Sequence, residues 1–116
     1  MAHNSKKTDN ERYYRNKKKR IDAKLSCRRK NRQLAKNYTF DYLKSHSCID
    51  CGEGDPIVLE FDHVRGEKKL GVAKMVAEGY SLATVINEIS KCEVRCANCH
   101  RRKTALQFGW NKHGKL

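Results

Sequence analysis

The fold is decided by two short stretches of this sequence, CIDC at residues 48–51 and CANC at residues 96–99. Each stretch is a C-x-x-C pair, which can offer two thiolates from one tight turn to a tetrahedral Zn²⁺ ion. The 44 residues between the pairs exceed an ordinary zinc-finger loop, so a further structural unit is expected between them. The spacing predicts one structural zinc site. Its ligands would be Cys48, Cys51, Cys96 and Cys99.

Two of the six cysteines, Cys27 and Cys92, lie outside these pairs. Because free cysteine behaves as a small hydrophobe, we expect Cys92 in the core and Cys27 on the N-terminal segment. A redox or metal-storage protein is a competing interpretation, but a thioredoxin-like exchanger needs only one C-x-x-C pair. The first 20 residues have no apolar segment of the kind that a secretory signal requires. This predicts a cytoplasmic protein in which clustered cysteines bind metal.

Length and charge narrow the class of protein. With 116 residues, 38% of them hydrophobic and 34% charged, the chain is expected to hold one small domain and an arm rather than a large multi-domain enzyme. A formal net charge of +13, from 26 Lys plus Arg against 13 Asp plus Glu, points to an anionic partner such as nucleic acid. No stretch approaches the roughly 20 apolar residues of a membrane span. We therefore expect DNA as the partner and no membrane.

The positive charge is concentrated toward the N-terminus. Residues 1–44 carry 15 Lys plus Arg and four Asp plus Glu, whereas residues 45–116 carry 11 and nine. Residues 10–36 contain no Gly or Pro and favour a helix, with a solvated or disordered tail as the alternative. We expect a basic helical arm over residues 1–44 that contacts DNA phosphates, and a metal-bearing domain over residues 45–116. The expected contacts in the arm are Lys17, Lys18, Lys19, Arg20, Arg28, Arg29, Lys30 and Arg32.

The remaining elements follow from hydrophobic pattern and capping signals. A stop at Gly79 and a cap at Ser81 separate two short helices. The expected elements are helices over 38–45, 72–78, 82–90 and 100–108, and strands over 57–64 and 93–95. The fold class is therefore α+β.

A second constellation lies between and beside the cysteine pairs. Asp62 and His63 stand side by side at the end of the apolar stretch 57–64, and His100 directly follows the second pair. The order C-x-x-C, then a strand with Asp-His, then C-x-x-C-His-Arg-x-Lys resembles the zinc-containing branch of the HNH endonuclease family. The resemblance covers about residues 48–104 and leaves the arm outside. It implies a ββα-metal core, also called a His-Me finger, stapled by the four-cysteine zinc site.

The resemblance also implies roles for these residues. His63 would be the general base, and Asp62 and His100 would hold a catalytic divalent metal. Hard oxygen ligands suit Mg²⁺ or Mn²⁺, and one imidazole also admits Ni²⁺ or Co²⁺. Cleavage of a phosphodiester needs a deprotonated water and a cation near the departing oxygen, so the chemistry agrees. Beside that metal, the basic residues expected to hold the phosphates are Arg101, Arg102 and Lys103.

Two features of this sequence complicate the assignment. Neighbouring side chains of a regular strand point to opposite faces, so Asp62 and His63 can serve one site only where the strand ends or bends. The asparagine that gives the family its middle letter is replaced by Lys91, and Asn87 and Asn98 are nearby alternatives for its bracing role.

The expected function is a metal-dependent DNA endonuclease that acts as a monomer and nicks one strand. The alternative is a non-catalytic, zinc-stapled module that binds nucleic acid.

Overall fold

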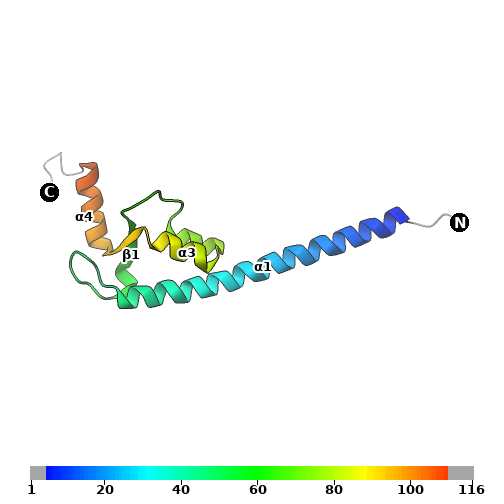
Figure 1. Ribbon diagram of the computed structural model, residues 1–116, viewed down its shortest axis with the longest axis horizontal. Helices are drawn as coiled ribbons and strands as arrows, with labels where there is room; N and C mark the ends of the chain where they lie inside the picture. The colour runs from blue at the N-terminus through cyan, green and yellow to red at the C-terminus, as the bar shows by residue number, and fades with distance from the viewer. Residues whose placement is uncertain (1–4, 110–116) are drawn as a thin grey trace.

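The computed structural model describes residues 5–109. They form an α+β fold with four α-helices, one short 3-10 helix and one antiparallel sheet of two strands (Figure 1). The elements in chain order are α1 (Ser5–Ser45), η1 (Pro56–Val58), β1 (Leu59–His63), α2 (Val72–Glu78), α3 (Leu82–Ile89), β2 (Cys92–Cys96) and α4 (Ala97–Phe108). The predicted fold class is confirmed at this level, whereas the ββα-metal motif stays a prediction.

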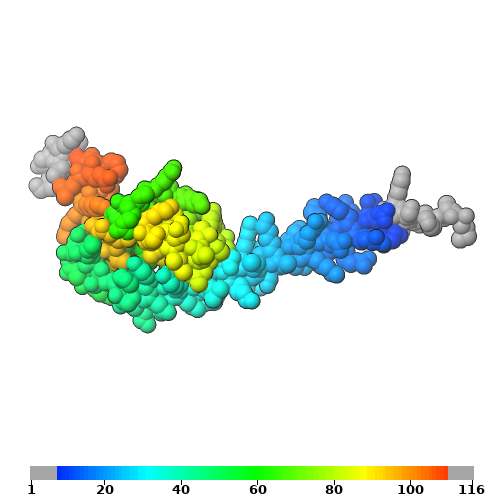
Figure 2. Space-filling view, viewed as in Figure 1, coloured from blue at the N-terminus to red at the C-terminus, as the bar shows by residue number. Residues whose placement is uncertain are grey.

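Helix α1 is one continuous helix of 41 residues. The expectation of a separate short helix over 38–45 is therefore wrong, because no Gly or Pro between residues 5 and 45 ends the helix. All side chains of residues 8–30 are exposed. Figures 1 and 2 show this part of α1 reaching away from the other elements, and the molecule measures 86 × 34 × 23 Å. We call residues 8–27 the projecting segment.

The C-terminal part of α1 belongs to the hydrophobic core. Ala35 is completely buried, and Tyr38 and Tyr42 pack partly buried beside it. These residues contact a cluster contributed by α2, α3 and β2. Its buried members are Val72, Met75, Val76, Val85, Ile89 and Cys92. The core therefore crosses the expected boundary between arm and domain at residues 44 and 45, and the expected core position of Cys92 is confirmed.

Gly79 brings the end of α2 against α1. It caps α2 in the left-handed region at φ 78°, and a Cβ atom there would lie 2.9 Å from the Cβ of Arg28. The Asn31 side chain donates a 3.0 Å hydrogen bond to the Gly79 carbonyl. Only glycine combines this backbone conformation with so close an approach. Along α1, contact with α2 therefore begins near Arg28.

The predicted boundaries of the short elements agree closely with the structure. Helix α2 ends at Glu78 with Gly79 as its C-cap, and Ser81 caps α3 by accepting a 3.3 Å hydrogen bond from the Thr84 amide. The first strand is shorter than expected because residues 56–58 form the 3-10 helix η1. Helix α4 begins at Ala97 and not at residue 100, because the Cys96 sulfur accepts from the Cys99 amide and caps the helix.

The two strands present one apolar and one polar face. Successive strand residues alternate between faces, and the register follows from the cross-strand pairs. On the apolar face these are Leu59 with Cys96, Phe61 with Val94 and His63 with Cys92. On the polar face they are Glu60 with Arg95 and Asp62 with Glu93. Side chains of α4 contact the polar face, while α1 packs on the apolar face.

Candidate metal centre and polar clusters

The four cysteines of the two C-x-x-C pairs come together in space. Their sulfur atoms all lie within 4.8 Å of one another, so they could hold a metal ion such as zinc. The Cys51 and Cys96 sulfurs are 3.7 Å apart. Thiolates about 2.3 Å from a tetrahedral Zn²⁺ ion are about 3.8 Å from each other, which agrees with this spacing. The predicted grouping of Cys48, Cys51, Cys96 and Cys99 is confirmed.

Local backbone geometry arranges these thiols. In the first pair a tight turn places the Gly52 amide 2.9 Å from the Cys48 carbonyl, while the second pair spans the end of β2 and the first turn of α4. Burial raises the pKa of Cys48, but hydrogen bonds from backbone amides outweigh it and lower that pKa to about 6. Hydrogen bonding with the Cys96 sulfur raises the pKa of Cys99 to about 12. A bound cation would favour the thiolate form of all four.

Asp62 is the centre of a polar cluster on the polar face of the sheet. Its carboxylate is buried, with 8% of the residue exposed. The Oδ2 atom accepts hydrogen bonds of 2.7 Å from both Arg95 and Lys103. Burial raises the pKa of Asp62, but Lys103, His100 and Arg95 together lower it below its usual value. We call Asp62, Arg95, His100, Lys103 and Glu60 the Asp62 cluster.

His100 lies between two carboxylates of this cluster. Its Nδ1 atom is 2.8 Å from Glu60 Oε1, and its Nε2 atom is 3.4 Å from Asp62 Oδ1. Two ligand atoms about 2.1 Å from one cation, at bond angles of about 90–110°, are about 3.0–3.4 Å apart. Asp62 Oδ1 and His100 Nε2 therefore fit as neighbouring ligands of one ion. Within the described residues, no third acidic, histidine or cysteine ligand joins them.

Arg95 connects the Asp62 cluster to the first cysteine pair. Besides Asp62, its guanidinium contacts Asp50 at 2.8 Å and Glu93 at 3.0 Å. Asp50 stands between Cys48 and Cys51 in the sequence. The position of the Asp62 carboxylate is thus tied to the turn that presents two of the four thiols.

His63 belongs to a different cluster, which it forms with Glu88, Lys91 and Lys69. We call these four residues the His63 cluster. Its Nε2 atom is 2.9 Å from Glu88 Oε2, and the Glu88 side chain is only 1% exposed. Glu88 also accepts from the Lys91 ammonium at 2.9 Å and the Lys69 amide at 3.0 Å. Burial raises the pKa of Glu88, but the Lys91, Lys69 and His63 contacts outweigh it and lower that pKa to about 2.

Asp62 and His63 therefore have different partners although they are consecutive. Asp62 contacts α4, whereas His63 contacts α3, as the alternation of a strand requires. The strand ends directly after His63, where the amides of Val64 and Arg65 both donate to the Lys91 carbonyl, at 2.9 and 3.2 Å. The structure brings Asp62 and His100 together. His63 follows Asp62 in the chain, but its side chain lies on the opposite face of the sheet.

The family's middle asparagine braces the general base, and three residues were considered for this role here: Lys91, Asn87 and Asn98. They lie at separate positions in the structure. Lys91 reaches His63 indirectly, since its ammonium contacts Glu88 and the Glu67 carbonyl. The Asn87 carbonyl accepts from Ser90, and Asn98 is exposed in the first turn of α4.

The basic residues expected to contact phosphate are mostly exposed. On α4, Arg101 and Arg102 are exposed and Lys103 is half-buried against Asp62. On α1, Arg32 is partly buried, and the other seven expected contacts are exposed. The four neighbouring residues Lys17, Lys18, Lys19 and Arg20 lie on the projecting segment.

Sequence reasoning missed three members of these clusters, namely Glu60, Glu88 and Arg95. Glu88 left a signal, because it lies on the apolar stripe of α3 with Val85 and Ile89 and a charge on such a stripe needs partners. Glu60 and Arg95 are cross-strand partners, and they become visible only once the register of the sheet is known.

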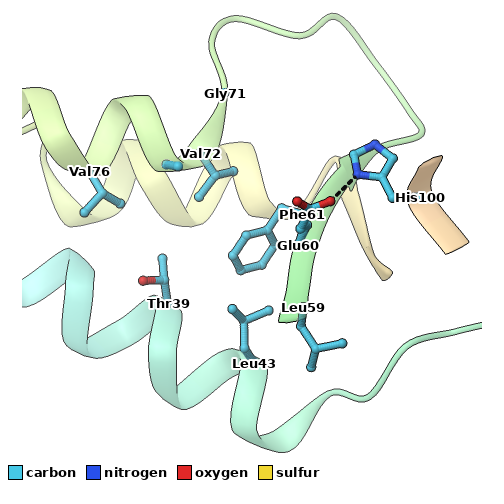
Figure 3. Close-up of a pocket in the computed structure, with 10 residues that line it drawn as sticks. Thr39, Leu43, Leu59, Glu60, Phe61, Gly71, Val72, Val76 and His100 are labelled. Carbon is cyan, nitrogen blue, oxygen red and sulfur yellow. Dashed lines mark hydrogen bonds and ion pairs between the residues drawn. The ribbon is translucent and has the colours of Figure 1, made fainter. Parts of the chain in front are cut away.

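A cavity of about 480 Å³ lies between α1, α2 and β1 (Figure 3). Its walls are mainly apolar, and the Glu60 and His100 pair is at one side of it. The apolar lining residues include Leu43, Leu59, Phe61, Val72 and Val76. The Asp62 cluster therefore borders an open cavity through His100.

Comparison with protein-family models, curated proteins and solved structures gave no match for this chain. None of the helices in the described part of the chain is long and apolar enough to cross a membrane. The chemistry of the two polar clusters and of the cysteine site is thus the basis for assigning a function.

Proposed function

We propose that this chain is a metal-dependent endonuclease of the HNH type that hydrolyses phosphodiester bonds in DNA. The observation that carries the proposal is the approach of Asp62 Oδ1 and His100 Nε2 to 3.4 Å, with His63 as the next residue after Asp62 at the end of β1. A carboxylate and an imidazole at this spacing suit one divalent cation, and two ligands leave positions for water and phosphate oxygens.

The surroundings of the two ligand atoms support this role. Arg95 and Lys103 occupy Asp62 Oδ2, so Oδ1 is the oxygen that remains for a cation. Glu60 holds Nδ1 of His100, which directs Nε2 toward Asp62. A carboxylate on the second ring nitrogen is the usual partner of a metal-binding histidine, because it orients the ring and raises its basicity. Mg²⁺ or Mn²⁺ would supply positive charge to the phosphate and the departing 3′ oxygen.

The protein residues would divide the remaining steps. His63 accepts a proton from a water molecule, and the water oxygen attacks phosphorus. The bond from phosphorus to the 3′ oxygen breaks, and that oxygen takes a proton from solvent. The products are a 3′-hydroxyl and a 5′-phosphate. Arg101, Arg102 and Lys103 would hold neighbouring phosphates.

In this proposal the four cysteines hold a structural zinc ion. A site with four cysteine ligands has no open coordination position, so it would not catalyse hydrolysis. Its task would be to hold α4, and thereby His100, against the sheet. The Asp50, Arg95 and Asp62 contacts extend that support to the second ligand.

The positive charge of α1 would provide affinity for DNA. Contacts to phosphate give affinity with little sequence preference. A chain with one catalytic site would nick one strand as a monomer.

One observation favours the alternative, a zinc-stapled module that binds nucleic acid without cleaving it. His63 is hydrogen-bonded to a buried glutamate on the face of the sheet opposite Asp62. In such a module both polar clusters would serve only to connect α3 and α4 to the sheet.

Supercoiled plasmid distinguishes the two functions. The wild type, His63→Ala and the control His46→Ala would be freed of exchangeable metal with EDTA and given Mg²⁺ or Mn²⁺, with zinc content checked. His46 is an exposed histidine that stacks on Tyr42, outside both clusters. We expect open-circle product from the wild type and the control but not from His63→Ala. Folded, zinc-loaded wild type that binds the plasmid without cutting it would establish the alternative.

A further inference from the structure

Glu88 is a buried charge whose position requires explanation. Its side chain is 1% exposed, and a buried carboxylate is costly unless charges and hydrogen bonds compensate it. The compensation comes from three directions. Lys91 contacts Oε1, while the Lys69 amide and His63 Nε2 share Oε2.

The contact determines which nitrogen of His63 carries the proton when the ring is neutral. An ionised carboxylate only accepts hydrogen bonds. The Nε2 atom, 2.9 Å from Glu88 Oε2, must therefore be the donor. The Nδ1 atom is left without a proton and can accept one.

The glutamate is itself held rigidly. Lys91 bridges Glu88 to the Glu67 carbonyl at 2.8 Å, and the Lys69 amide belongs to the segment that follows β1. Helix α3, the residue before β2 and that segment thus converge on one carboxylate. The Lys91 ammonium compensates the charge and the Lys69 amide adds a hydrogen bond, while the third contact orients an imidazole.

We propose that Glu88 is the positioning residue of His63, which fixes the ring as the Nε2–H tautomer and leaves Nδ1 to accept the proton of the attacking water. The catalytic consequence rests on the proposed nuclease function. The tautomer rests only on the hydrogen bonds of the His63 cluster, so the two parts can be tested separately.

The first experiment measures the ring nitrogens of His63 by nitrogen NMR in the full-length, zinc-loaded protein, at a pH where the ring is neutral. Wild type should show a proton on Nε2. In Glu88→Gln the amide oxygen should turn to the Lys91 ammonium, which carries the full charge, and the Lys69 amide then loses its acceptor. The amide nitrogen donates to Nε2, so that the Nδ1–H form appears. The control Glu78→Gln changes an exposed glutamate of α2 and should leave the tautomer unchanged.

A second variant covers the case in which Glu88→Gln does not fold. In Glu88→Gln combined with Lys91→Met, no ammonium attracts the amide oxygen, so that oxygen can accept from Lys69 and His63 again. We expect the Nε2–H form to return. A folded variant of either kind whose tautomer contradicts these expectations would overturn the positioning role.

Cleavage kinetics test the catalytic consequence. We expect Glu88→Gln to lower kcat about 100-fold with little change in KM, because a general base contributes about that much, and the double variant to recover part of the loss. A folded Glu88→Gln protein with wild-type kcat would refute that consequence. If the wild type cleaves no DNA, the nuclease function fails, while the NMR measurement still decides whether Glu88 positions His63.

Discussion

At the scale of single residues, the two oxygens of Asp62 have different partners. Oδ2 accepts from Arg95 and Lys103, while Oδ1 faces His100 Nε2. The first set of contacts belongs to the folded structure, and the second would be completed by a cation. One carboxylate therefore serves both stability and the proposed chemistry, and substitution should affect both.

Asp62→Asn should abolish most cleavage and also destabilise the fold. The neutral amide cannot compensate the charges of Arg95 and Lys103. Breaking a buried ion pair costs about 3–5 kcal/mol when the other charge is left uncompensated, and the loss should be smaller here because Asp50 and Glu93 still contact Arg95. Plasmid cleavage and thermal unfolding would measure the two effects. Asp41→Asn, at an exposed carboxylate of α1, is the matched control and should change neither.

The low pKa of Glu88 predicts how acid affects stability. A carboxyl group whose folded pKa of about 2 lies below the ordinary 4.5 stabilises the protein above pH 4.5. That stability is lost as the pH falls from about 4.5 through about 2. Glu88→Gln should therefore be less stable at neutral pH and lose less stability over this interval. Urea unfolding of both proteins at each pH gives the difference, and parallel curves would contradict the prediction.

At the scale of elements, α1 combines two tasks in one helix. Its C-terminal part packs in the core through Ala35, whereas the projecting segment is exposed throughout. At a rise of about 1.5 Å per residue, a 20-residue segment extends about 30 Å, close to one turn of duplex DNA. Changes in this segment should alter the proposed DNA binding without altering the fold.

Replacement of Lys17, Lys18, Lys19 and Arg20 by Gln should weaken DNA binding. Each lost phosphate contact should make the slope of log K against log salt shallower by about 0.9. Binding titrations at several salt concentrations would measure this slope. Circular dichroism should show an unchanged helix content, because these side chains are exposed and Gln is a good helix former. An unchanged salt slope would show that this segment does not contact DNA.

Gly79→Ala should loosen the contact between α2 and α1. The new Cβ would lie 2.9 Å from Arg28 Cβ, and the backbone has a φ of 78°. We expect a loss of about 1–3 kcal/mol in the free energy of unfolding. Gly54→Ala is the control, because a Cβ there meets nothing within 4 Å. Equal stability of the two variants would contradict the close packing.

At the scale of the whole molecule, residues 5–109 form two buried hydrophobic clusters. The first joins α1, α2 and α3 around Met75 and contains none of the four clustered cysteines. The second joins both cysteine pairs to the sheet around Leu59 and Val94. Phe61 and Tyr42 pack against both clusters. A metal bound by the four cysteines would therefore stabilise the second cluster more than the first.

Removal of the zinc ion that we propose for the four cysteines should weaken the second cluster first. Cys96→Ser, or a strong chelator, should speed amide exchange in β2 and α4 while α2 and α3 keep more of their protection. Hydrogen exchange measured by NMR would show the order. Cys27→Ser is the control, since Cys27 is exposed on α1. Uniform loss of protection would show that the two clusters unfold as one unit.

Local signals determined much of this protein by sequence alone. The spacing of the cysteines predicted their grouping, Gly79 marked the end of α2, and Ser81 marked the start of α3. The helix ends depend on residues close together in the chain, where backbone conformation and capping decide the outcome. The two cysteine pairs are separated by 44 residues, and their grouping was predicted from the ligand number that zinc prefers. The continuity of α1 was missed although no Gly or Pro interrupts it.

Only the tertiary structure decided which charged groups meet. The link from Asp50 through Arg95 to Asp62 and the contact between Glu88 and His63 join residues distant in sequence. They also give the consecutive residues Asp62 and His63 different partners. Such pairs depend on the register of two strands and on which helix covers which face. A one-residue change of register would move each strand side chain to the other face of the sheet and replace every one of these partners. For this reason the sequence pattern determined the elements, whereas packing determined the site.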